Sequence, residues 1–302
     1  MKYSPILLVL AAPLLAQAPA AAAKPVAATI NSSDTAIVRG LYVNRFAAQS
    51  TKRMKQLIAM ADSTEINAFV IDIKDEFGLN FAATDSSVAR NAGRMGVIPN
   101  LKSLLDTLRA HRILSIARIV VFKDSVTARL NPAWNIRKAD GSAWRDKAGM
   151  LWVNPFNRDL WEYNIRVAEA AVRLGFGEVQ FDYIRFPEPY KSLPPQVFPG
   201  QGTQIKEQVL AEYLKLARAR LAKLGVRTTA DIFGLVTTVN GALEVGQRWE
   251  VLAPVTDVLL PMVYPSHYPR GSFNIAHPNA EPYKVIFSAI IKAHERNAKA
   301  AS

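Results

Sequence analysis

The chain has 302 residues, 50% of them hydrophobic, so it can bury a sizeable core in one large domain or two modest ones. It contains no cysteine, which excludes a disulfide framework, thiol catalysis and thiolate-bound zinc. Its net charge of +12 is scattered over the whole sequence, so we expect a solvated basic surface and no nucleic-acid partner. An anionic polysaccharide would suit this charge.

The residues up to Ala23 have the layout of a secretory signal peptide. Lys2 gives a positive start, an apolar run of about a dozen residues follows, and small residues lead to Ala23. A membrane anchor needs about twenty apolar residues, and Pro13 and Pro19 interrupt this run. We therefore expect cleavage after Ala23, a secreted or periplasmic protein without a membrane anchor, and a short lead-in at residues 24–36.

From residue 37 onward, apolar runs alternate with amphipathic helices. Most of the apolar runs are nearly continuous, as expected for parallel strands that are covered on both faces. The strands are predicted at residues 36–47, 66–78, 113–124, 177–187, 226–236 and 256–266.

The helices between the strands show clear start and stop signals. Asn157 is a candidate N-cap for the helix at 157–175, and Gly175 is its candidate C-terminal stop. The other main helices are predicted at residues 98–112, 204–225 and 282–299. The absence of a linker or a shift in composition predicts a single domain.

Strict alternation of strand and helix leaves two architectures, an open doubly wound sheet or a (β/α) barrel. The first strand-to-helix turn has no glycine-rich phosphate loop, which argues against the nucleotide-binding form of the open sheet. Nearly every strand ends on charged or polar residues. In a barrel these ends meet at one rim, where the functional site is built, so the pattern favours the barrel.

Two aspartates at successive strand ends are the candidate catalytic pair. Asp182 lies where the strand in "EVQFDYIRFP" stops being apolar, and Asp231 holds the same place on the next strand. Neighbouring strands lie about 5 Å apart, so the two carboxyl groups should face each other. Two acids in one cleft can serve as proton donor and nucleophile, the arrangement that glycoside hydrolysis needs. Alternatively, Asp182 is a structural acid paired with Arg185 or with a base on a neighbouring strand.

Further rim residues are assigned to substrate binding because charged groups can orient sugar hydroxyls and aromatic rings can stack on sugar faces. Asp72 and Lys74 could equally form a buried ion pair, and the tryptophans of loop 123–156 could form a small core. The substrate-binding candidates are Asp72, Lys74, Arg118, Tyr183, Arg185, Tyr264, His267 and Trp152. The four histidines lack metal-ligand spacing, so neither a metal nor another cofactor is predicted.

Several long segments in order, among them "NAFVIDIKDEFG", "EVQFDYIRFP" and "LPMVYPSHYPRGSF", resemble a bacterial domain of unknown function grouped with the glycoside hydrolases. That family is distantly similar to the α-amylase-like barrels, and the resemblance spans residues 37–295. It implies a (β/α)8 TIM barrel acting on polysaccharide, with Asp182 as nucleophile and Asp231 as proton donor. Amylase-like enzymes usually carry Glu in the second role.

The chain offers only six strands, so the barrel domain, residues 37–302, is expected to be shortened at its C-terminal end to about six βα units. The predicted function is an exported, retaining glycoside hydrolase that uses an Asp/Asp pair on a polysaccharide. The alternative is a non-catalytic carbohydrate-binding barrel, in which the two acids only hydrogen-bond sugar hydroxyls.

Overall fold

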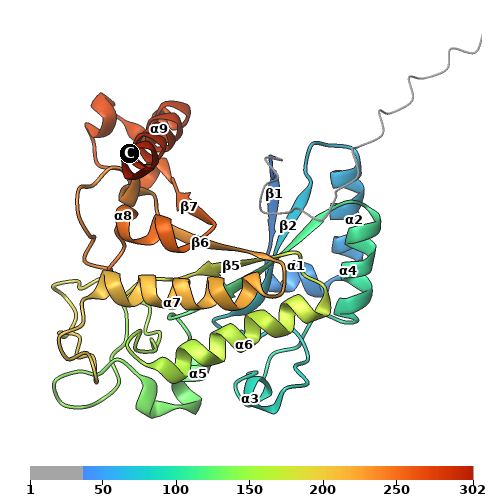
Figure 1. The fold of residues 1–302 in the computed structure, drawn as a ribbon, viewed down its shortest axis with the longest axis horizontal. Helices are drawn as coiled ribbons and strands as arrows, with labels where there is room; N and C mark the ends of the chain where they lie inside the picture. The colour runs from blue at the N-terminus through green and yellow to red at the C-terminus, as the bar shows by residue number, and fades with distance from the viewer. Residues whose placement is uncertain (1–36, 302) are drawn as a thin grey trace, which may run out of the picture.

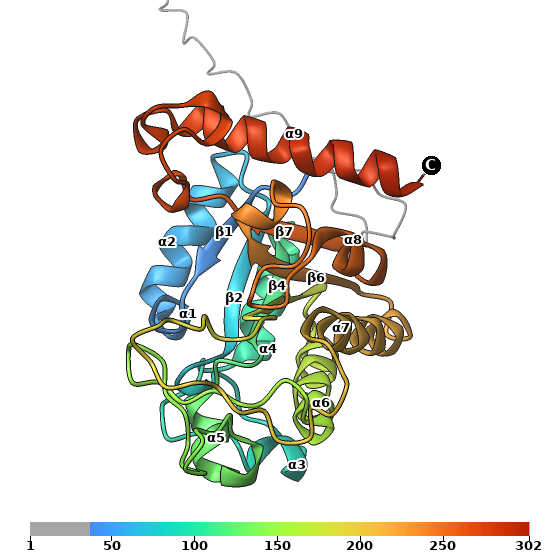
Figure 2. The same ribbon diagram turned by 90° about the vertical axis from the view of Figure 1, so that its left-hand side faces the viewer.

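The computed structural model describes residues 37–301, in which six parallel strands curve into a half-barrel (Figures 1 and 2). The strands pair in chain order, β1-β2-β4-β5-β6-β7, and a short β3 pairs antiparallel with β2. Their bounds are β1 Gly40–Val43, β2 Ala68–Asp75, β3 Gly78–Leu79, β4 Leu114–Val120, β5 Glu178–Asp182, β6 Arg227–Phe233 and β7 Val258–Met262. All six predicted strands are confirmed, and the fold is a partial TIM barrel.

The expected signal peptide and lead-in lie outside the described residues. In the part of the chain that is described, no helix combines the length and the apolar character needed to cross a bilayer.

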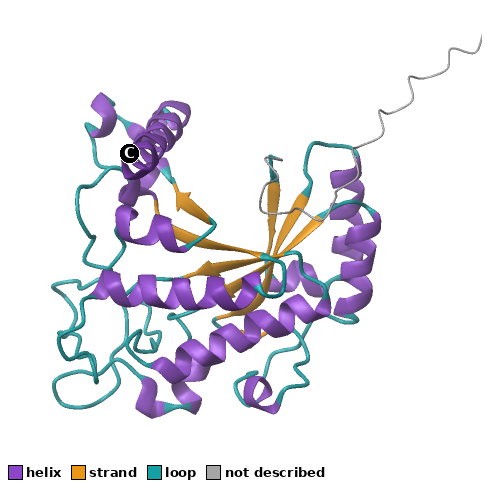
Figure 3. Cartoon of the chain, viewed as in Figure 1, coloured by secondary structure: helices purple, strands orange, loops and turns teal. Residues whose placement is uncertain are grey.

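Helices follow the strands and cover the convex face of the sheet (Figure 3). The predicted cap at Asn157 is confirmed, since its side chain accepts a hydrogen bond from the amide of Leu160. Gly175 ends the same helix with φ of 121°, a conformation that favours glycine. The helices are α1 Arg45–Gln49, α2 Thr51–Asp62, α3 Ser86–Ala89, α4 Leu101–Ala110, α5 Ser125–Leu130, α6 Arg158–Leu174, α7 Lys206–Ala222, α8 Trp249–Leu252 and α9 Pro282–Ala301.

The main core lies between the sheet and its outer helices. Tyr213 of α7 is fully buried there and meets Phe122, Trp161 and Phe181 edge-on, with ring centroids 5.5–5.8 Å apart. Edge-to-face pairs of this kind add to the burial of the rings themselves. This packing fixes β4 and β5, the two central strands, against α6 and α7.

The two ends of the sheet are β1 and β7, and among the described residues these two strands do not pair with each other. The concave face of the half-barrel is therefore open along one side. Its polar residues lie on the central strands and at their carboxyl ends, the edge from which a barrel presents its site.

Candidate active site

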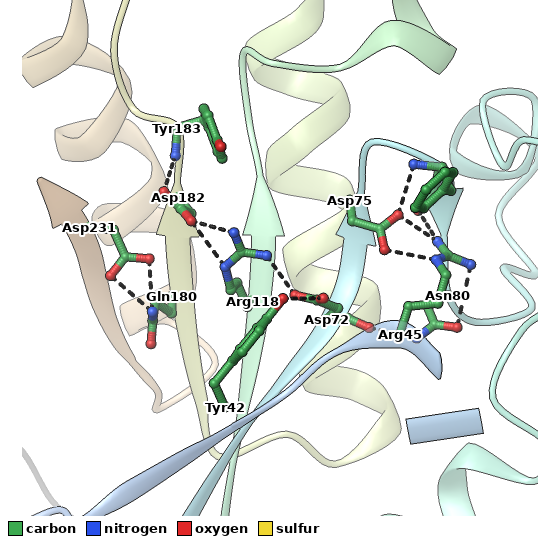
Figure 4. Close-up of polar contacts among 12 residues, drawn as sticks. Tyr42, Arg45, Asp72, Asp75, Asn80, Arg118, Gln180, Asp182, Tyr183 and Asp231 are labelled. Carbon is green, nitrogen blue, oxygen red and sulfur yellow. Dashed lines mark hydrogen bonds and ion pairs between the residues drawn. The ribbon is translucent and has the colours of Figure 1, made fainter. Parts of the chain in front are cut away.

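The register of the central strands places three polar side chains at one level of the concave face. Asp72 of β2 pairs with Arg118 of β4, and Arg118 pairs with Gln180 of β5. Residues paired across parallel strands point to the same face of the sheet. Figure 4 shows the side chains of Asp72, Arg118 and Gln180 together on this face.

One step nearer the rim, the same register brings the two candidate acids together. Phe181 of β5 pairs with Ala230 of β6, so the residues that follow them, Asp182 at the end of β5 and Asp231 two residues before the end of β6, lie side by side. Successive residues of a strand alternate between the two faces of the sheet. Since Phe181 and Ala230 face the core, the carboxyl groups of Asp182 and Asp231 point to the concave face (Figure 4).

Asp182 is surrounded by hydrogen-bond donors. The Arg118 Nε lies 3.1 Å from its Oδ2, and a second guanidinium nitrogen contacts the same oxygen. The backbone N–H of Tyr183 donates to its Oδ1 at 2.5 Å. Hydrogen bonds from a guanidinium and from an amide restrict the rotation of a carboxyl group. The orientation of the Asp182 side chain is therefore fixed.

A second carboxylate holds Arg118 from the other side. The Arg118 Nη1 donates to Oδ1 of Asp72 at 2.6 Å, and the Tyr42 hydroxyl donates to Oδ2 of Asp72 at 2.7 Å. Burial raises the pKa of Asp72, and burial together with this hydrogen bond raises the pKa of Tyr42. Arg118 is shared by two acids, which raises its own pKa and keeps it charged.

Asp231 is as buried as Asp182, each with 6% of its surface exposed, but its hydrogen-bond partner is a neutral side chain. The amide nitrogen of Gln180 donates to both of its oxygens, at 2.9 and 2.8 Å. Burial and, after it, the neighbouring charge of Asp182 raise the pKa of Asp231 to about 7. Asp231 therefore keeps its proton below a pH of about 7, while the neighbouring Asp182 is held by charged and backbone donors.

The raised pKa of Asp231 makes a prediction that needs no substrate. The unfolded chain loses this proton near the ordinary value of 3.8, whereas the folded chain keeps it up to about 7, so the free energy of unfolding falls as pH rises between these values. Asp231→Asn should remove this loss, which amounts to a few kcal/mol. Urea unfolding of both proteins from pH 4 to 8 measures it.

As a control, Asp159→Asn changes an exposed aspartate in the first turn of α6 and should leave the slope of stability against pH unchanged in this window. Parallel curves for wild type and Asp231→Asn would contradict a raised pKa at Asp231.

Beside Asp182 the structure has a cavity of about 550 Å³ at the carboxyl ends of β5, β6 and β7. The cavity brings together five of the residues that the sequence assigned to substrate binding: Arg118, Tyr183, Arg185, Tyr264 and His267. Tyr264 and His267 meet edge-on, with ring centroids 5.4 Å apart. The size suits a site for one or two sugar rings, and its walls combine aromatic and charged groups.

Tyr183 enters this cavity through an unusual backbone conformation. Its φ of 53° lies in the left-handed region, which costs a residue with a side chain on the order of 1–3 kcal/mol. The same conformation lets its amide bond Asp182 while its ring lines the cavity. Strain of this kind is typical of functional sites, because the surrounding fold stabilises it only where the geometry is needed.

Residues 40–302 match the family described as "Putative glycosyl hydrolase domain". The chain belongs to this family. No curated protein matches the sequence.

Among solved structures, this glycosyl hydrolase domain is similar to a hypothetical protein from Ruminiclostridium thermocellum ATCC 27405. The two share 34% identity with a TM-score of 0.57, over 63% of this chain and 96% of that one. An exo β-N-acetylglucosaminidase from Vibrio harveyi aligns at 16% identity and a TM-score of 0.51 over 76% of this chain. The Flavobacterium johnsoniae chitobiase aligns at 13% identity and a TM-score of 0.50 over 80% of this chain.

This chain spans 42% of each of those two enzymes, and the identities are low, so the likeness to them concerns the barrel fold alone. It agrees with the resemblance to glycosidase barrels that the sequence predicts.

Three residues that the sequence assigned to substrate binding in this glycosyl hydrolase domain, Trp152, Lys74 and Asp72, do not reach the cavity. Trp152 is 1% exposed, donates its indole N–H to Asp146 at 2.9 Å, and packs edge-on against Tyr183 at 5.8 Å. The expected sugar-stacking role of Trp152 is therefore wrong in this structure, because the ring has no free face. It supports the cavity wall from behind.

Lys74 requires a similar correction. Asp72 pairs with Arg118, but Lys74 pairs with Ile119, so the register shifts between them. Such an irregularity turns a side chain to the other face of the sheet. Lys74 lies 2.6 Å from Asp124 with both side chains 0% exposed, and it also donates to the carbonyl of Val120. Lys74 thus forms a buried ion pair, as the alternative interpretation expected, but its partner is Asp124 and not Asp72.

Replacing Lys74 alone should destabilise the domain strongly, because the charge of Asp124 would remain buried without its partner. Lys74→Met is expected to cost about 3–5 kcal/mol in urea unfolding. The double change Lys74→Met with Asp124→Asn should recover part of this loss. Lys102→Met breaks an exposed pair on α4 and should cost less than about 1 kcal/mol. Equal losses in the free energy of unfolding for Lys74→Met and Lys102→Met would contradict the assignment of Lys74 to a buried ion pair with Asp124.

Asp72 also lies outside the cavity wall, behind Arg118, which it holds in place. Gln180 donates to Asp231 and Tyr42 donates to Asp72, and neither residue was predicted from the sequence to belong to the site. A signal for Gln180 was available: it is a polar residue inside an apolar strand, two positions before Asp182 and so on the same face.

Proposed function

We propose that this chain is an exported glycoside hydrolase that cleaves O-glycosidic bonds of a polysaccharide, with Asp182 as nucleophile and Asp231 as proton donor. The observation that carries the proposal is the contrast between the two acids. Both are buried, but Asp182 lines the cavity and accepts from Arg118 and the Tyr183 amide. Asp231, beside it and behind the cavity wall, accepts from the neutral Gln180 amide and has a pKa raised to about 7. Two neighbouring carboxyl groups in opposite environments fit the two roles of this reaction.

In the first step Asp231 gives its proton to the glycosidic oxygen, and the bond between that oxygen and the anomeric carbon breaks. Oδ1 of Asp182, which among the described residues accepts only from the Tyr183 amide, forms an ester bond to the anomeric carbon, and the alcohol half of the substrate leaves. In the second step Asp231, now ionised, takes a proton from water. The water oxygen bonds to the anomeric carbon and Asp182 is released as a carboxylate.

Arg118 and Gln180 support this chemistry without reacting. Arg118 bonds one oxygen of Asp182 and so directs the carboxylate toward the cavity. Gln180 bonds Asp231 and limits the rotation of its carboxyl group. The positions of the two acids, side by side on neighbouring strands, support the short separation of retaining enzymes, about 5–5.5 Å.

One observation favours the alternative, a carbohydrate-binding barrel without catalysis. Both oxygens of Asp182 already accept hydrogen bonds, which weakens a carboxylate as a nucleophile. The two functions differ in their products, because a binding barrel releases no new reducing ends.

The experiment is a screen of the purified mature chain against surface and extracellular polysaccharides, with new reducing ends as the readout. Proton NMR of the first product shows its anomeric form. We expect cleavage with the anomeric configuration retained. An inverted product would refute Asp182 as a nucleophile, and binding without cleavage would favour the binding barrel.

Export is part of the proposal and has its own measurement. The sequence of the first residues supports cleavage after Ala23. N-terminal sequencing of the protein recovered from the periplasm or medium of a bacterial host should then begin at Lys24. Recovery only from the cytoplasm, with the N-terminus intact, would refute export.

A further inference from the structure

Arg185 is a nearly buried guanidinium in the wall of the cavity. Three aromatic rings surround it, with its Cζ 4.6 Å from the ring centroid of Phe233, 5.0 Å from that of Trp152 and 5.2 Å from that of Tyr183. Such rings favour a cation and hold its planar group in one orientation. Arg185 is thus prepared as a rigid positive group inside the cavity where the glycan would bind.

The hydrogen-bonding capacity of Arg185 is only partly used. Its Nη1 donates to the carbonyl of Phe186 and to Oε2 of Glu188, both at 3.1 Å. Among residues 37–301, its Nε and Nη2 have no hydrogen-bond acceptor. A guanidinium carries five donor hydrogens, so several remain for a ligand. Arg118 has less free hydrogen-bonding capacity, because its guanidinium nitrogens donate to two carboxylates, those of Asp182 and Asp72.

The charged residues that line the cavity are two arginines, Arg118 and Arg185, and two acids, Asp182 and Glu188, and a further cation lies next to the Tyr183 ring. The ammonium of Lys123 lies 5.0 Å from the centroid of the Tyr183 ring, and in the described part of the chain it forms no ion pair. Two cations, Arg185 and Lys123, therefore lie near the Tyr183 ring, and Glu188 is the carboxylate that partners one of them.

We propose that Arg185 binds the carboxylate of a uronic acid, so that the glycan taken by this cavity is acidic. The inference deepens the proposed function and rests on it for the ligand being a glycan. A carboxylate is planar and matches the fork of a guanidinium with two parallel hydrogen bonds. Glu188 competes for the same guanidinium from a position about one-third exposed, so a substrate carboxylate can displace it.

The experiment measures binding rather than turnover, in the Asp182→Asn background. The probes are polygalacturonate, alginate and hyaluronate, each compared with its carboxyl-reduced form, in which CH2OH replaces the carboxylate. At least one acidic polymer is expected to bind about tenfold or more tightly than its reduced form. Adding Arg185→Gln should remove this preference, and adding Glu188→Gln should increase it by removing the competing carboxylate.

Arg53→Gln is the matched control, because Arg53 is an exposed arginine on α2, outside the cavity, and its loss should leave the preference unchanged. Melting curves show whether each variant is folded. The Glu188→Gln result tests the proposal even if Arg185→Gln fails to fold.

The proposal is overturned if no acidic polymer binds better than its reduced form, or if the preference is the same with Arg185→Gln or Glu188→Gln. The outcomes also distinguish a failure of the uronate site from a failure of the proposed hydrolase function. An acid preference that depends on Arg185, in a wild-type chain that cleaves nothing, overturns catalysis alone. Cleavage of a neutral glycan without acid preference overturns the uronate site alone.

Discussion

The kcat/KM for glycan cleavage is expected to fall about tenfold for each pH unit above about 7. Asp231 must carry a proton to assist the leaving oxygen, and the pKa of this carboxyl is raised to about 7, so the active fraction is lost as pH rises through that value. The Asn variant of Asp231 should lower kcat/KM by about 10²- to 10⁴-fold at pH 6 and abolish this limb of the profile. Initial rates between pH 5 and 9 measure both effects.

An aryl glycoside with a good leaving group provides the control, because its departure needs little protonation. Its first-step rate should fall far less with Asp231→Asn than that of the polysaccharide. An equal loss of rate on both substrates would contradict the role of Asp231 as proton donor. If Asp231→Asn kept the wild-type pH profile, the fall of kcat/KM above about pH 7 could not be due to Asp231.

Replacement of Asp182 by Asn is expected to abolish the first step, with a loss on the order of 10⁴-fold or more in kcat, because no nucleophile then reaches the anomeric carbon. The Asn side chain keeps the size of the carboxyl and can accept from Arg118 through its oxygen, so glycan binding should persist. Calorimetric titration with a bound polysaccharide and rate measurements on the same preparation separate the two effects.

The same variant also tests the link between the two acids. Loss of the Asp182 charge should lower the pKa of Asp231, since that charge is a cause of the upward shift. The pH-dependent fall in stability should then end at a lower pH in Asp182→Asn. If the variant cleaved the polysaccharide at the wild-type rate, Asp182 would have no catalytic role.

The sequence was sufficient to predict the strands and the position of the site. Near-continuous apolar runs marked the six parallel strands, and the first polar residues after them marked the rim. Asp182 and Asp231 could be placed together because they hold equivalent positions at the ends of consecutive strands, and sequential pairing makes consecutive strands neighbours.

Details of register and packing could not be predicted in this way. Lys74 faces away from the site because the pairing of β2 with β4 shifts by one residue after Asp72. No residue type in this segment indicates such a local irregularity. The burial of Trp152 depends on contacts with Asp146 and Tyr183, which lie six and thirty-one positions away in the sequence. Composition alone does not distinguish such a ring from one that stacks on sugar.

The sequential strand order also has a consequence for the order of assembly during folding. Each strand from β2 onward, apart from the short β3, pairs with the strand formed just before it, so contacts can build from the N-terminus as the chain lengthens. Asp72, Arg118 and Asp182 belong to β2, β4 and β5, and their ion pairs can form before β6 arrives. Asp231 on β6 comes last. The strand order therefore allows the charged network to form before the buried acid joins it.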